Sequence, residues 1–198
     1  IVGDVSGAGE RIAANITVNA TGDIQLKGNG GAPDARITAN QNGGSCSVGS
    51  KGGDITLLAD DVITIENGAV VSANARCSAG TIVLSAEEIT IDGLVESAST
   101  LTGTGAVQRP GGGPITMDAT CNLLVSATGV VSSSGRDPGA DLVHLSGGCK
   151  VRIEGLVEST GPANSVPNSP PNHCNSTNRP DKPTNSTACI EVWAGDAL

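Results

Sequence analysis

The chain has 198 residues, a formal net charge of −9, 28 glycines, one tryptophan, and neither tyrosine nor phenylalanine. This composition excludes a core built around aromatic rings, and the few Lys and Arg residues argue against binding to nucleic acid or to anionic lipid. No apolar run approaches the about 20 residues of a membrane helix, so we expect no insertion into a membrane.

A repeat of three short apolar segments, separated by turn residues, recurs along the chain. Residues 1–15 either begin a coil or form an N-terminal cap. First strands are expected at Ile16–Val18, Ile55–Leu57, Ile82–Leu84, Ile115–Met117, Val143–Leu145 and Ile190–Val192. Second strands are expected at Ile24–Leu26, Ile63–Ile65, Ile89–Ile91, Leu123–Val125 and Val151–Ile153. Third strands are expected at Arg36–Thr38, Val70–Ser72, Leu94–Glu96, Val130–Ser132 and Leu156–Glu158.

The insertions between these strands are one-sided. The distance from a first to a second strand barely changes, whereas long segments follow third strands at Ala39–Gly53, Ala98–Gly113 and Thr160–Ala188. Stacked coils tolerate insertions at one corner, because an insertion elsewhere would break a sheet. We therefore predict an all-β fold: a right-handed parallel β-helix, or three-faced β-solenoid, of about five coils with insertions at one corner.

The predicted organisation is a single β-helix domain or segment over residues 1–198. Stacked coils occupy 16–159, a loop rich in Pro, Asn and Ser occupies 160–189, and a further coil starts at 190–198. Because that last coil stops before a complete second strand, we expect either a segment of a longer array or a coil that a partner completes.

The six cysteines form an even set without a CxxC pair, which favours disulfides and an oxidising, extracellular or cell-surface setting over metal or redox chemistry. Cys121 and Cys149 each lie six residues after a coil start, so they share a corner of consecutive coils and are expected to pair. The same register suggests Cys46 with Cys77, and Cys174 with Cys189 across the long loop. Free buried thiols are the alternative.

Two acidic pairs, Asp60-Asp61 and Glu87-Glu88, fall in the same turn of consecutive coils. Carboxylates about 5 Å apart could act as acid and nucleophile in a retaining glycosidase, or bind Ca²⁺. A solvated acidic corner is the interpretation we favour, so we predict no cofactor, no metal site and no catalytic residue. His144, at an outward strand position, lacks a Ser, Cys or Asp neighbour that would imply a triad, and is expected to be an ordinary surface residue.

Four Asn-x-Ser/Thr sequons are candidate glycosylation sites, although a chain this rich in Asn, Ser and Thr contains several by chance. Those in the long loop are expected to be the better exposed. The four sites are Asn15, Asn19, Asn175 and Asn185.

The phrases GGDITLLADDVITIENGAVVSA, GTIVLSAEEITIDGLVES and CKVRIEGLVEST resemble the repeats of filamentous-haemagglutinin-type bacterial surface proteins. The resemblance covers about residues 12–160 and implies a secreted right-handed β-helix with an adhesive role. The cysteines and the Pro-rich loop depart from that family, in which Cys is scarce.

Three functions remain open. The first is an extracellular structural or adhesive module, part of a larger surface fibre or a self-assembling filament, whose partners are further coils or copies end to end and surface glycans or proteins. The second is a polysaccharide-active enzyme of the pectate-lyase or polygalacturonase kind, for which only Asp61 and Glu88 could be nominated. The third is ice binding, which the interrupted outward row of Thr17, Thr56, Val83, Thr116, His144 and Glu191 disfavours.

Overall fold

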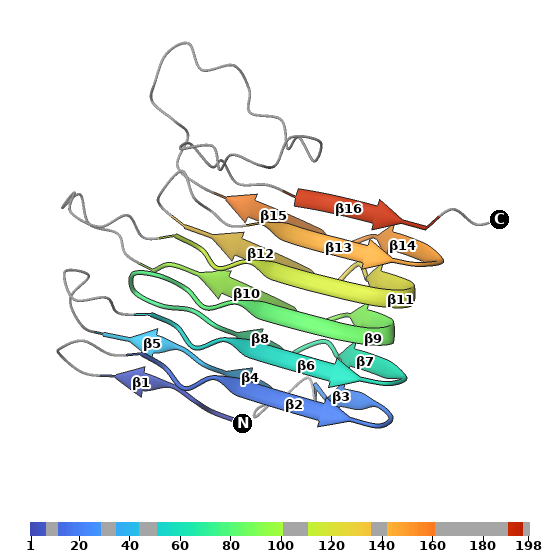
Figure 1. The fold of residues 1–198 in the computed structure, drawn as a ribbon. Helices are drawn as coiled ribbons and strands as arrows, with labels where there is room; N and C mark the ends of the chain where they lie inside the picture. The colour runs from blue at the N-terminus through green and yellow to red at the C-terminus, as the bar shows by residue number, and fades with distance from the viewer. Residues whose placement is uncertain are drawn as a thin grey trace, which may run out of the picture.

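The computed structural model describes residues 1–6, 12–28, 35–43, 51–100, 111–135, 142–160 and 190–195. Across these residues the protein forms sixteen strands and no helix (Figure 1). Every pairing between those strands is parallel. The predicted all-β class is therefore confirmed, and the parallel pairing of successive repeats is consistent with a β-solenoid.

The strands fall into two larger sheets and one two-stranded sheet. A nine-stranded sheet contains β2 (Ile16–Ala20), β3 (Ile24–Leu26), β6 (Ile55–Ala59), β7 (Val62–Ile65), β9 (Ile82–Ile91), β11 (Ile115–Val125), β13 (Val143–Gly147), β14 (Lys150–Ile153) and β16 (Ile190–Ala194). A five-stranded sheet contains β4 (Arg36–Thr38), β8 (Val70–Ser72), β10 (Leu94–Ala98), β12 (Val130–Ser134) and β15 (Leu156–Thr160). The two-stranded sheet pairs β1 (Val5–Ser6) with β5 (Gln41–Asn42).

The register between repeats follows the predicted phases. The starting residues of the first strands pair in one continuous column: Ile16, Ile55, Ile82, Ile115, Val143 and Ile190. The third strands form a second column behind the first, in the order of the sequence (Figure 1). The expected strand positions are confirmed.

First and second strands share one sheet, a finding that the sequence did not suggest. In two repeats they merge, since β9 and β11 run through the corner without a break, and β11 is irregular between Ala119 and Asn122. The stretch Ser85–Glu88 contains no Gly or Pro, so nothing in it forces the backbone to leave the extended conformation. In the flanking repeats the chain bends at Asp60-Asp61 and at Gly148-Cys149 instead.

The core lies between the two larger sheets and consists of Ile, Leu, Val, Ala and one Met. Alternate residues of each strand point inward, as β geometry requires, so that Ile55, Leu57, Leu84 and Leu145 are fully buried. Each such side chain stabilises the fold by about 1.5–3 kcal/mol through burial alone. Aliphatic side chains are thus sufficient to fill this narrow interior.

Glycines occur where the backbone turns or where repeats approach closely. Gly68 has a φ of 89° in the turn between β7 and β8, a conformation that disfavours other residues. Gly80 and Gly113 precede first strands, and a Cβ on Gly80 would lie 2.7 Å from the Gly53 carbonyl carbon. This close stacking explains why Gly occurs just before successive first strands.

Two buried serines, Ser97 and Ser133, lie against these glycines. The Ser97 hydroxyl donates to the Gly80 carbonyl at 2.6 Å and accepts from the Gly113 N–H at 3.0 Å. The Ser133 hydroxyl donates to the Gly113 carbonyl at 2.9 Å. These hydroxyls thus give hydrogen-bond partners to backbone groups of Gly80 and Gly113. Such partners stabilise the fold, because a buried backbone group without one costs free energy.

At the N-terminal end, residues 1–6 lie beside the beginning of the stack rather than apart from it. Val2 bridges Thr38 and β1 pairs with β5, both in parallel. The Ile1 ammonium donates to the Arg36 carbonyl at 2.8 Å. This segment therefore adds a further strand position below β4 and β5.

Candidate functional site

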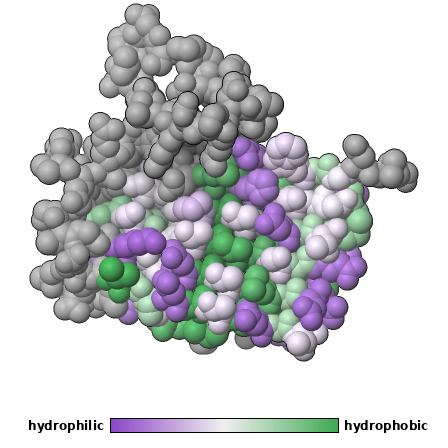
Figure 2. Space-filling view, viewed as in Figure 1, coloured by the Kyte–Doolittle hydropathy of each residue, from purple (hydrophilic) through white to green (hydrophobic). Residues whose placement is uncertain are grey.

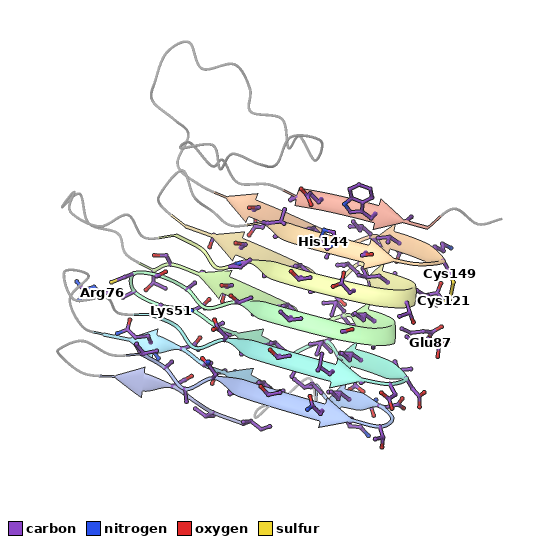
Figure 3. All side chains as sticks on the ribbon, viewed as in Figure 1. Lys51, Arg76, Glu87, Cys121, His144 and Cys149 are labelled. Atoms are coloured by element: carbon purple, nitrogen blue, oxygen red, sulfur yellow. A yellow bond between two sulfur atoms is a disulfide. The ribbon has the colours of Figure 1, made fainter. Side chains whose placement is uncertain are left out.

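The corner between first and second strands carries the predicted disulfide. Cys121 and Cys149 are bonded, with Cα atoms 4.5 Å apart, and they stack at one edge of the molecule (Figure 3). The Cys149 N–H donates to the Cys121 carbonyl at 2.7 Å, so the bridge reinforces an existing backbone contact. The pairing inferred from coil register is confirmed.

The remaining cysteines are described only in part. Cys77 is also disulfide-bonded, whereas its predicted partner, Cys46, lies outside the described residues. Cys174 and Cys189 lie outside them as well, so both of these pairings stay predictions.

The acidic corner lies on the same edge as the disulfide, where Glu87 is drawn below Cys121 in Figure 3. Asp60, Asp61, Glu87 and Glu88 are all exposed, and the Glu88 N–H donates to the Asp61 carbonyl at 3.0 Å. The Glu88 carboxylate accepts from Asn122 Nδ2 at 2.9 Å. Exposure to solvent weakens every interaction that these carboxylates make, and this setting is the one expected for a solvated corner.

The described residues contain no group of three or more His, Cys, Asp or Glu side chains that could bind a metal ion. The corner therefore offers no geometric support for calcium.

Two ladders of side-chain acceptors border the sheets and were not predicted. Beside the third strands, the Asp4 carboxylate accepts the Asn40 N–H at 2.7 Å, Asn40 Oδ1 accepts the Asn74 N–H at 2.7 Å, and Asn74 Oδ1 accepts the Ala98 N–H at 2.6 Å. Each side chain thus bonds to the backbone of the next repeat. The sequence did contain a signal, because Asn40 and Asn74 each follow a third strand by two residues.

A second ladder precedes the first strands. Asn15 Oδ1 accepts the Asp54 N–H at 2.9 Å, and the Asp54 carboxylate accepts the Thr81 N–H at 2.8 Å. Asp54 also forms an ion pair with Lys51 at 3.2 Å. The next residue in phase is Pro114, which has no N–H to donate, so the ladder ends there.

The predicted sequons divide between described and undescribed residues. Asn15 and Asn19 are both exposed at β2, and the Asn15 side chain also has the structural role given above. Asn175 and Asn185 lie outside the described residues.

The outer face of the nine-stranded sheet holds the one cluster with mixed chemistry that we find in the described chain. The imidazole of His144 lies between two carboxylates, with Nε2 3.6 Å from Asp118 Oδ1 and Nδ1 3.4 Å from Glu191 Oε2 (Figure 3). The expectation that His144 has no Asp neighbour is therefore wrong. It failed because Asp118 comes from another strand, two positions from the residue that pairs with His144.

Two more side chains complete this cluster. Ser146 is paired with both Asp118 and Trp193, and Glu191 is paired with His144. Since side chains alternate along a strand, all five point to the same outer face, opposite to the buried Leu145. We refer to these five residues as the outer-face cluster: Asp118, His144, Ser146, Glu191 and Trp193.

No helix in the described part of the chain is long and apolar enough to cross a membrane. Comparisons with protein-family models, with curated proteins and with solved structures returned no match.

Proposed function

We propose that the chain is a right-handed, three-faced parallel β-helix that serves as a structural and adhesive module outside the cell. The observation that carries the proposal is the continuous parallel column of first strands, in which equivalent residues of successive repeats pair one above the other. Right-handedness follows from the strong preference of crossovers between parallel strands. Stacking of this kind gives a stiff rod whose outer surface is available for contacts.

The disulfides support the extracellular part of the proposal. Cys121–Cys149 closes a corner and Cys77 is also bonded, and such bridges persist in oxidising compartments. The acidic corner offers little to the competing enzyme function, because its carboxylates are exposed and Glu88 is bonded to Asn122.

Assembly end to end is the second part of the proposal. At the C-terminal end of the stack, residues at core positions are exposed: Ile153 of β14 by 40%, and Ile190 and Val192 of β16 by 38% and 47%. Leu145, which pairs with Val192, is fully buried. Covering these side chains with a further coil, or with another copy, would remove apolar surface from water. The backbone of β16 also presents a sheet edge that can pair with a further parallel strand.

Sedimentation velocity over a rising series of protein concentrations tests this assembly. We expect larger species to accumulate with concentration, and Val192→Glu to restore the monomer because it places a charge on the exposed end. Leu58→Glu is the matched control, since Leu58 is also exposed but lies on the outer face of β6. A wild-type chain that stays monomeric throughout, or equal effects of both variants, would refute self-assembly.

A further inference from the structure

The outer-face cluster combines an exposed indole with hydrogen-bonding groups. Trp193 lies on β16, where it pairs with Ser146 of β13. The residue is 53% exposed. A large aromatic ring on a sheet surface can still bury its apolar face against a ligand, and its N–H can donate. Figure 2, drawn from this side, shows polar and hydrophobic residues intermixed at the surface.

The charged members of the cluster lie close to one another. His144 faces Glu191 on one side, at 3.4 Å, and Asp118 on the other, at 3.6 Å. Asp118 keeps 52% of its side chain exposed, so it retains acceptor capacity toward a ligand. The cluster thus places carboxylate acceptors beside an exposed indole.

The charge of the cluster restricts the ligand. Two carboxylates lie within it and the whole chain has a net charge of −9, so phosphates, uronic acids and sulfated sugars would be repelled. A neutral pyranose has the matching pattern, with an apolar C–H face for the indole and hydroxyl donors at its rim for the carboxylates.

We propose that the outer-face cluster binds a neutral saccharide chain, with one ring stacked on Trp193 and hydroxyls donating to Asp118 and Glu191. The inference rests on the adhesive role proposed above and names the ligand class for it. All five residues belong to one chain, so a single copy holds the complete cluster.

Intrinsic fluorescence provides a direct assay, because Trp193 is the only tryptophan and the chain has no tyrosine. The full chain is titrated with cellohexaose, laminarihexaose and mannohexaose, and in separate arms with hexagalacturonate and a fully deacetylated glucosamine hexamer. We expect a saturable change with at least one neutral hexasaccharide and none with hexagalacturonate. A response to the cationic glucosamine hexamer alone would overturn the proposal in favour of a site for ammonium groups.

Calorimetry of variants with the responding sugar assigns the site. Trp193→Ala and Asp118→Asn should each weaken binding by about tenfold or more, as expected for residues central to an interface. Leu58→Ala, an exposed apolar side chain in the same outward row, should bind as the wild type. The absence of binding by every neutral sugar, or unchanged binding by both cluster variants, would overturn the inference. Either result leaves the sedimentation outcome unaffected, so the two proposals fail separately.

Discussion

The ladder beside the third strands supports a quantitative prediction for Asn74→Ala. The Asn74 side chain accepts the Ala98 N–H at 2.6 Å and donates to the Glu96 carboxylate at 2.6 Å. Its loss leaves the Ala98 N–H without this partner, at a cost of about 1–3 kcal/mol, and removes a second bond with a net contribution of about 1 kcal/mol. We expect the free energy of unfolding to fall by about 2–4 kcal/mol.

Urea unfolding followed by far-ultraviolet circular dichroism measures this change. Asn67→Ala is the matched control, because Asn67 is exposed in the turn between β7 and β8 and its loss should change stability by less than about 0.5 kcal/mol. Asn74→Asp should fall between the two, since it keeps the acceptor for Ala98 but places a second carboxylate beside Glu96. If Asn74→Ala proved no more destabilising than Asn67→Ala, the ladder would not be a stabilising element.

Three further predictions concern the Cys121–Cys149 disulfide, the closely stacked Gly80 and the acidic corner. Replacing Cys121 and Cys149 by Ser opens a bridge between residues 28 apart in sequence, and should lower the free energy of unfolding by about 3–4 kcal/mol in urea; an unchanged midpoint would contradict the entropic reasoning. Gly80→Ala inserts a methyl group against the backbone of the preceding repeat and should cost about 1–3 kcal/mol, whereas Gly22→Ala, which meets only the Asp61 carboxylate at 3.9 Å, should be tolerated; similar melting temperatures for the two would argue against close stacking. Millimolar calcium should leave the melting temperature unchanged in both the wild type and Asp61→Asn, and a rise seen only in the wild type would show that the acidic corner binds the ion.

The strands could be predicted because their signal is local and repeated. Ile, Val and Leu alternate with polar residues over three to five positions, and the same alternation recurs after each turn. The position of each strand within its repeat can therefore be assigned without knowing any tertiary contact. The Cys121–Cys149 pair followed from that assignment. The merging of first and second strands in β9 and β11 did not, because a corner and a continuous bent strand share the same apolar spacing.

The outer-face cluster was missed for a different reason. His144, Asp118 and Glu191 come from three strands, and their meeting depends on the register of β11, β13 and β16 together. The repeat register compares His144 with the outward residues of its own row, whereas Asp118 lies in the outward row two positions along. The Asn ladders were missed because Asn is common in turns and loops. The sequence does not show whether such a side chain bonds to a neighbouring repeat or to water.

Nuclear Overhauser contacts along the first-strand column test the stacked architecture most directly. Parallel stacking in register predicts methyl contacts from Ile55 to Ile82 and from Ile82 to Ile115, together with contacts from Leu57 to Leu84. Strong contacts between opposed α-protons of neighbouring strands, which are typical of antiparallel pairs, together with an absence of these methyl contacts, would contradict it.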